Sequence, residues 1–244
     1  MRDLTIFVCT YNSALTLEKC LTSVTNCEPD SKVVVIDHDS TDSTTVIAER
    51  FGAEVHRENV GLGYARQLAL ELAESRYFAF VDGDEEVTNP LFFRCAAKRL
   101  EASVVGAVVG MAEGHRFTYG LPMGMTVFRS EDFRGKVIPP GIDAREEYFV
   151  QRRLRSLGLR TVFLSDAKVH RSQYRKFKPE WEGANTRLAC GLSLRQLLFA
   201  LKVTLLLSLN SRSFRNMAYV PVFYLRFLRG FAKPQPWRRL RLAL

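Results

Sequence analysis

The 244-residue sequence lacks the cysteine pattern of a disulfide-stabilised or zinc-binding protein. Its five cysteines are odd in number, and no two of them form a C-x-x-C pair. A secreted disulfide framework normally shows an even set of cysteines, and a zinc site normally shows closely spaced pairs. The composition therefore predicts free thiols in a reducing compartment, which favours a cytoplasmic location.

Long uninterrupted hydrophobic runs and low-complexity repeats are also missing. The apolar run near the N-terminus is too short for a signal peptide and has no small-residue cleavage site, so we interpret it as a first strand. The longest apolar stretch, residues 192–209, contains Arg195 and Lys202. A membrane-spanning helix needs about 20 predominantly apolar residues, so this stretch is borderline and favours a helix lying in the membrane interface.

Acidic residues are scarce in the last third of the chain. Residues 1–170 carry 20 Lys/Arg and 24 Asp/Glu, a net charge of −4, whereas residues 171–244 carry 15 Lys/Arg and 2 acids, a net charge of +13. This asymmetry predicts a globular unit over residues 1–170 followed by a basic segment, 171–244, that meets a polyanionic surface.

Short apolar runs alternate with helical patterns in the first part of the chain. Up to residue 86 we predict strands over 4–9, 33–36, 54–56 and 77–81, and helices over 15–24, 43–51 and 64–74. Beyond it we predict helices over 90–100 and 144–157, and strands over 104–111, 125–128, 161–164 and 168–170. The alternation is typical of an α/β fold with a Rossmann-like, mainly parallel sheet covered by helices on both faces.

The stretch YFAFVDGDEE, residues 77–86, joins a buried strand to a group of acids. Ligands of open α/β sheets bind at the carboxyl ends of the strands, where Asp82 and Asp84 are expected. Two carboxylates with a glycine between them suit Mg²⁺ or Mn²⁺, which in turn bind a diphosphate. The alternative is an ordinary acidic turn. Polar loops at residues 37–42 and 61–63 follow other strands, so a single cleft at this edge is expected.

Five motifs in order resemble the family 2 glycosyltransferases of the GT-A fold. They are FVCTYNSALTLEKCLTSV, VVVIDHDSTDST, RENVGLGYARQLAL, FAFVDGDEEV and REEYFVQRRLRSLG, which together cover roughly residues 1–170. The resemblance implies a nucleotide-sugar half over about residues 1–86, an acceptor half over about 87–170, and inverting sugar transfer.

The resemblance also implies roles for individual residues. Thr10, Tyr11, Asn12 and Asp37 would line the nucleotide-base pocket, Arg66 would hold the nucleotide, Asp82 would face the ribose or the metal, and Asp84 and His170 would ligate the metal. Glu147 stands at the position of the catalytic Asp and would be the general base.

Three positions depart from the family pattern. His38 and Asp39 replace the usual Asp-Gly, and Asp39 is expected to stand in for the missing acid. Glu147 is one methylene longer than Asp, and Gln67 replaces an Asn. Alternative interpretations stay open: a satisfied histidine in a basic turn for His170, and a solvated first helical turn for the acids at 146–147.

The basic segment combines aliphatic runs with aromatic and cationic side chains. Such a composition favours an anionic membrane surface, on the inner face of the membrane, and suits nucleic acid poorly. A helical hairpin packed on the catalytic domain and a dimer interface are the alternatives. The sequence leaves the oligomeric state open.

We therefore predict a metal-dependent glycosyltransferase that uses a nucleotide-sugar donor and a lipid-linked or glycan acceptor. A non-catalytic nucleotide-sugar-binding scaffold is the alternative from another class. A nucleotidyltransferase is less favoured, because residues 10–13 do not form the Gly-rich basic loop of that class. The sequence does not identify the sugar, the nucleobase or the acceptor.

Overall fold

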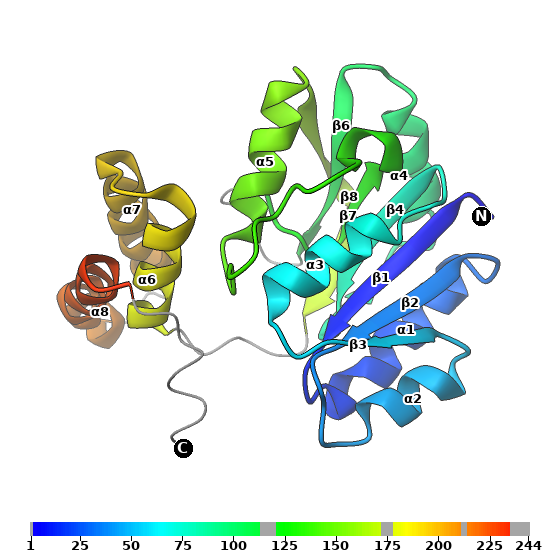
Figure 1. Ribbon diagram of the computed structural model, residues 1–244, viewed down its shortest axis with the longest axis horizontal. Helices are drawn as coiled ribbons and strands as arrows, with labels where there is room; N and C mark the ends of the chain where they lie inside the picture. Colours follow the sequence, from blue (N-terminus) through cyan, green and yellow to red (C-terminus); the bar gives the residue numbers. More distant parts are fainter. Residues whose placement is uncertain (1, 113–120, 172–177, 211–213, 235–244) are drawn as a thin grey trace. The chain divides into compact units, whose positions relative to one another are not determined.

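The computed structural model describes residues 2–112, 121–171, 178–210 and 214–234 (Figure 1). The chain divides into two compact units. The first comprises residues 1–140 and 146–174, and the second comprises residues 141–145 and 175–244.

An eight-stranded sheet forms the centre of the first unit, as far as the structure describes it. The strands, in spatial order, are β3 (Glu54–Arg57), β2 (Lys32–Asp37), β1 (Leu4–Thr10), β4 (Tyr77–Asp82), β7 (Thr126–Arg129), β6 (Val105–Ala112), β8 (Arg160–Arg171) and β5 (Glu85–Val87). The first four are mutually parallel, and β7 and β5 run antiparallel to their neighbours. The predicted α/β class is confirmed.

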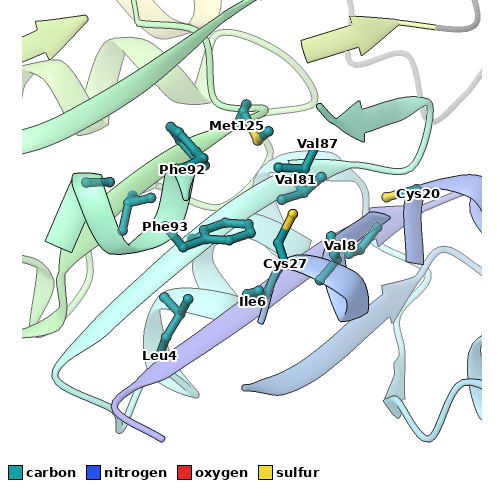
Figure 2. Packing of buried hydrophobic residues seen from close by; sticks show 14 of the residues in the cluster. Leu4, Ile6, Val8, Cys20, Cys27, Val81, Val87, Phe92, Phe93 and Met125 are labelled. Carbon is teal, nitrogen blue, oxygen red and sulfur yellow. The ribbon is translucent and has the colours of Figure 1, made fainter. Parts of the chain in front are cut away.

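Helices cover both faces of this sheet. They are α1 (Ala14–Cys27), α2 (Thr44–Arg50), α3 (Leu62–Glu71), α4 (Phe92–Leu100) and α5 (Glu146–Ser156). Because side chains alternate along a strand, Leu4, Ile6 and Val8 of β1 share one face. They pack there in one cluster with residues of α1 and α4, including Cys20 and Phe93 (Figure 2).

Aromatic rings fill the opposite face of the sheet. Phe7, Phe78 and Phe80 of β1 and β4 contact one another, with ring centroids 5.6–6.3 Å apart. Phe128 of β7 stacks on Phe78 at 5.1 Å. In Figure 1, α3 crosses in front of the sheet. Edge-to-face and offset contacts of this kind add to the burial energy of the rings, so this face holds β4 firmly in place.

The register of the parallel strands places the predicted loops together. Cys9 lies opposite Asp82, and Thr10 lies opposite Asp37. The strands therefore end at one edge of the sheet, and the loops that follow them meet there.

Three predicted elements need correction. Residues 161–164 and 168–170 belong to one strand, β8, whose pairing with β6 shifts register between Leu164 and Lys168. The irregularity interrupts the apolar pattern without ending the strand. The acidic turn after Asp84 instead contains the short strand β5, which pairs with β8. A one-turn 3₁₀ helix, η1 (Ser130–Phe133), for which we made no prediction, follows β7.

The second unit is helical. It contains α6 (Pro179–Cys190), which we did not predict, followed by α7 (Leu194–Asn210) and α8 (Phe214–Ala232). The backbones of α6 and α8 approach so closely that a Cβ added to Gly183 would lie 2.0 Å from the carbonyl oxygen of Phe227. Among the described residues, no helix is long and apolar enough to cross a membrane.

The cluster in Figure 2 predicts the effect of removing a buried ring. Phe93 is fully buried, whereas its neighbour Leu91 is 55% exposed. Phe93→Ala should lower the free energy of unfolding by about 3–5 kcal/mol, measured by urea denaturation. Leu91→Ala, the matched control, should change it by less than about 0.5 kcal/mol. Equal effects of the two substitutions would contradict the packing.

Candidate active site at the carboxyl edge of the sheet

A buried carboxylate holds the loops after β1 and β2 together. Asp37 is fully buried and accepts hydrogen bonds from the hydroxyl of Thr10 (2.8 Å) and from the backbone N–H and hydroxyl of Ser40 (2.8 and 2.6 Å). These three donors compensate the cost of burying the carboxylate. Asp37 therefore fixes the two loops that we predicted to line the base pocket.

The loop after β1 is fastened to the loop after β2. The N–H of Asn12 donates to the hydroxyl of Ser40 at 2.8 Å, and the Asn12 side-chain oxygen accepts from the N–H of Thr41 at 2.9 Å. Asn12 and Asp39 both have positive φ values, 47° and 44°, which Asn and Asp tolerate better than most residues. Both side chains are exposed, and the neighbouring Tyr11 is 54% exposed.

Arg66 of α3 lies against Asp82 at the end of β4. Its Nη2 donates to Asp82 Oδ1 at 2.5 Å, and its guanidinium lies over the Phe80 ring at 4.3 Å from the centroid. The Arg66 side chain is 2% exposed, and that of Asp82 is 32% exposed. Within the described part of the chain, Arg66 Nε and Nη1 are buried without a hydrogen-bond partner.

Further ionisable groups surround this pair. Burial raises the pKa of Glu146 from 4.5 to about 7, and the charge of Glu147 adds to this shift while that of Arg66 opposes it. Burial likewise raises the pKa of the Cys9 thiol to about 11. Glu146 is therefore largely protonated below neutral pH, and Cys9 is a neutral thiol.

Two carboxylates face the backbone of Gly124. A Cβ added there would lie 2.6 Å from Asp82 Oδ2 and 2.4 Å from Glu85 Oε2. Only glycine leaves room for both oxygens at this point. Oxygen ligands from one or two carboxylates, completed by substrate phosphates, are what Mg²⁺ usually takes, so the chemistry of these donors fits a divalent metal held together with a diphosphate.

The predicted metal ligands are only partly described. Asp84 is half-buried in the turn between β4 and β5. The backbone of His170 pairs with Glu86, and its side chain lies outside the described residues. Among the side chains that the structure describes, no group of three or more His, Cys, Asp and Glu could hold a metal ion.

A histidine–glutamate pair lies beside the loops after β1 and β2. His38 Nδ1 is 2.7 Å from Glu58 Oε1, and the His38 ring meets the Tyr11 ring edge-on at 5.2 Å between centroids. Glu58 Oε2 accepts from the N–H groups of Val60 and Gly61 at 2.6 and 2.8 Å. Glu58 lies just after β3, within the motif RENVGLGYARQLAL, but we predicted no role for it.

The sequence prediction of the site stays a prediction, but the structure places its parts at one edge. The loops of Thr10, Asp37 and Asp82 meet there, and electrostatic interactions link Arg66 to Asp82 and Glu146. Glu147 follows Glu146 in the first turn of α5 and is half-buried. The sequence prediction gave no role in the site to Glu58, Glu85, Gly124 or Glu146, although Glu58, Glu85 and Glu146 lie within the quoted motifs.

Gln67, which departs from the family pattern, anchors another loop. Its side-chain oxygen accepts from the N–H groups of Val137 and Ile138 at 3.0 and 2.9 Å, and its nitrogen donates to the carbonyl of Gly135 at 3.2 Å. The longer side chain thus fixes the loop between η1 and α5 against α3.

A Rossmann-like sheet with acids and a buried arginine at its carboxyl edge defines a GT-A-type nucleotide-binding protein. The model of glycosyl transferase family 2 matches residues 5–158, and the chain belongs to that family. The glycosyltransferase GlyA of Streptococcus pneumoniae is 29% identical over 132 residues, which are 51% of this chain and 18% of GlyA. The chain spans 18–37% of the length of GlyA and four other curated glycosyltransferases that it matches.

Solved structures support the fold. TarS residues 1–349 of Staphylococcus aureus, in complex with UDP-GlcNAc, superimpose with a TM-score of 0.62 at 20% identity. The match covers 76% of this chain and 65% of that TarS fragment. The mannosyltransferase PcManGT of Pyrobaculum calidifontis, in complex with GDP-Man and Mn²⁺, gives a TM-score of 0.66 at 16% identity. The match covers 95% of this chain and 86% of the PcManGT chain. The predicted GT-A fold is confirmed.

The raised pKa of Glu146 predicts a pH-dependent stability. Between pH 4.5 and about 7 the unfolded chain releases this proton and the folded chain keeps it, so rising pH favours unfolding. Glu146→Gln, which stays neutral, should gain roughly 1–3 kcal/mol relative to wild type between pH 4.5 and 8, measured by urea denaturation. The surface variant Glu101→Gln should show no comparable gain. Parallel stability curves for wild type and Glu146→Gln would contradict the assignment.

Proposed function

We propose that the protein is an inverting glycosyltransferase that moves a sugar from a nucleotide-diphosphate sugar to a hydroxyl or phosphate group of a lipid-linked or glycan acceptor. The observation that carries this proposal is the meeting of Asp82, the buried Arg66 and Glu146 at the carboxyl edge of a family 2 sheet. The relatives solved with UDP-GlcNAc and GDP-Man support a nucleotide-sugar donor.

In this proposal the nucleotide lies over the loops after β1, β2 and β4. Tyr11, Asn12 and Asp39 offer exposed side chains to it, while Thr10 and Asp37 fix the loops beneath. Asp82 is held by Arg66 and faces the ribose or the metal. The positive charge of Arg66 lies in a low-dielectric interior, where it attracts the diphosphate more strongly than it would in water.

Glu147 is the proposed general base. It takes the proton of the acceptor hydroxyl as the oxygen attacks the anomeric carbon and the bond to the nucleoside diphosphate breaks, which inverts that carbon. Glu146 is less suited to this role near neutral pH, because burial raises its pKa to about 7. Its protonated form instead lessens the repulsion between the site and an anionic donor.

Asp82 and Asp84, with His170 as a further candidate, would hold Mg²⁺ or Mn²⁺. Such an ion would act as a Lewis acid that neutralises charge on the departing diphosphate. The complex of PcManGT with Mn²⁺ supports the choice of a divalent cation. The missing Cβ of Gly124 leaves room for the carboxylate oxygens of Asp82 and Glu85 to lie side by side.

We further propose that the second unit binds the anionic inner face of a membrane. Leu194, Leu198 and Leu205 lie on one face of α7, with exposed fractions of 45–71%, and Arg195 and Lys202 are exposed beside them. On α8, Leu225 is 65% exposed next to Arg226. Exposed leucines flanked by cations are typical of helices that lie in an anionic interface.

Substitution of the proposed base separates catalysis from binding. Glu147→Gln should lower transfer from the preferred nucleotide sugar by about 10²–10⁴-fold and leave nucleotide affinity within about twofold. Asp84→Ala should instead weaken metal-dependent nucleotide binding, measured by calorimetry with Mn²⁺. Glu101→Gln is the matched control. Undiminished turnover in both Glu147→Gln and Asp84→Ala would refute the assigned roles.

Membrane binding is tested by flotation with vesicles that contain an anionic phospholipid. Leu198→Glu, on the exposed face of α7, should reduce the floated fraction several-fold, because it replaces inserted apolar surface by a charge that the lipid repels. Leu91→Glu is the matched control, since Leu91 is 55% exposed and Leu198 is 57% exposed. Equal flotation of wild type and Leu198→Glu would refute this surface.

A further inference from the structure

The proposed general base lies two residues after a short segment that groups with the helical unit. Residues 141–145 belong to the second unit, and Glu146 returns the chain to the first. Arg145 is half-buried and is the last residue before α5, whose first turn carries Glu147. The backbone of Arg145 therefore sets the direction in which the chain enters the helix of the base.

The side chain of Arg145 is bound to α6 through a buried hydroxyl group. Its Nε donates to Thr186 Oγ1 at 3.0 Å, and its Nη2 lies 3.7 Å from Glu182 Oε2. Thr186 is 1% exposed, and its hydroxyl donates its one proton to the carbonyl of Glu182 at 2.7 Å. The hydroxyl oxygen is thereby left to accept from Arg145. Both partners of Arg145 lie on one face of α6, because they are four residues apart.

Arg145 has a backbone conformation and a position that do not favour arginine. Its φ is 70°, in the left-handed region where the Cβ of an L-residue is crowded. A cation just before a helix also meets the positive end of the helix dipole. Residues in such conformations persist where the surrounding structure fixes them. The contacts of Arg145 with Thr186 and Glu182 supply this fixation.

Helix α6 gives these contacts a firm base within its unit. Gly183 of α6 lies against the backbone of Phe227 in α8, and Gly230 of α8 lies against the backbone of Glu180 in α6. A Cβ at either glycine would clash with the facing backbone. Two helices packed at this distance interdigitate with few voids, so α6 has little freedom to shift along α8.

We infer that Arg145 is a positioning residue for the transfer reaction. Its hydrogen bond to Thr186 keeps the backbone in the conformation from which α5 begins, so that the first turn stays formed and Glu147 keeps its place. The inference deepens the proposed function and rests on it, because it gives α6 a part in aligning the base. In this role Arg145 acts through Glu147 and not on the substrate. Misplacement of a reacting group by about 1 Å can cost about 10²-fold in rate.

Substitutions at both ends of the hydrogen bond test this role kinetically. Arg145→Ala and Thr186→Val should each lower kcat by about 10–100-fold and leave the KM of the donor within about twofold. Thr186→Ser keeps the hydroxyl and should keep kcat close to that of wild type. The measured reaction is release of nucleoside diphosphate from a panel of UDP-, GDP- and dTDP-sugars with Mn²⁺, in which water replaces the acceptor hydroxyl. Turnover is expressed per nucleotide-binding site counted by calorimetry, so that unfolded protein does not lower it.

Hydrogen exchange provides a readout that does not depend on activity. The amides of residues 141–150 should exchange faster in Arg145→Ala and Thr186→Val than in wild type, because less interaction opposes local opening. Thr186→Ser should exchange as wild type does. Arg155→Ala is the matched control: Arg155 is exposed on α5 and donates to Gln151 Oε1 at 3.4 Å. This control should change neither kcat nor the exchange of residues 141–150.

The outcomes separate the inference from the proposed function. Wild-type kcat in Arg145→Ala and Thr186→Val, or an equal loss of kcat in Thr186→Val and Thr186→Ser, would overturn the inference while the proposed function stands. Unchanged exchange over residues 141–150 in Arg145→Ala would do the same. Arg145→Ala keeps the test valid if Thr186→Val fails to fold. Absence of nucleotide release by wild type from every sugar of the panel would overturn the proposed function itself.

Discussion

The buried guanidinium of Arg66 is the constraint on which the rest of the site depends. A charge removed from water is costly unless it is paired, and Arg66 is 2% exposed with Asp82 as its hydrogen-bonded ion partner at 2.5 Å. Its face lies on Phe80, within the aromatic layer of the sheet. Movement of Asp82 would leave a buried cation unpaired, so α3 and the end of β4 are fixed together. Asp82 can therefore contact a ligand while Arg66 keeps its carboxylate in place.

The carboxyl groups near Asp82 are more numerous than the cations that the structure places beside them. One carboxylate oxygen is directed to Arg66, while the other lies near Gly124 together with Glu85. Glu146 adds a third carboxyl group, and burial raises its pKa to about 7. Acids thus outnumber the buried arginine at this edge. A diphosphate would be repelled by such a surplus unless a cation accompanied it, which is a physical reason to expect metal and nucleotide to bind together.

The pattern of apolar residues along the chain was sufficient to predict the buried strands and the amphipathic helices. The strand that ends at Asp82 and the helix that carries Arg66 were both recognisable, because an apolar run and an amphipathic turn are properties of neighbouring residues. The short strand β5 was not, since Glu85 and Glu86 resemble a solvated turn until β8 pairs with them. Gly124 gave no signal either: its importance comes from carboxylates about forty residues away in the sequence.

The pair at His38 includes a carboxylate that motif comparison alone does not single out. The usual family acid is replaced by His38, and the sequence pointed to the adjacent Asp39 as its substitute. Asp39 is exposed with φ of 44°, whereas Glu58 is buried with its carboxylate against the His38 ring. A carboxylate at the end of β3 is therefore hydrogen-bonded to the side chain that follows β2. Parallel strands make this contact feasible, because positions about twenty residues apart in sequence become neighbours at one edge. A charge near the end of one strand can thus come from the loop after the neighbouring strand, where a motif of consecutive residues does not reveal it.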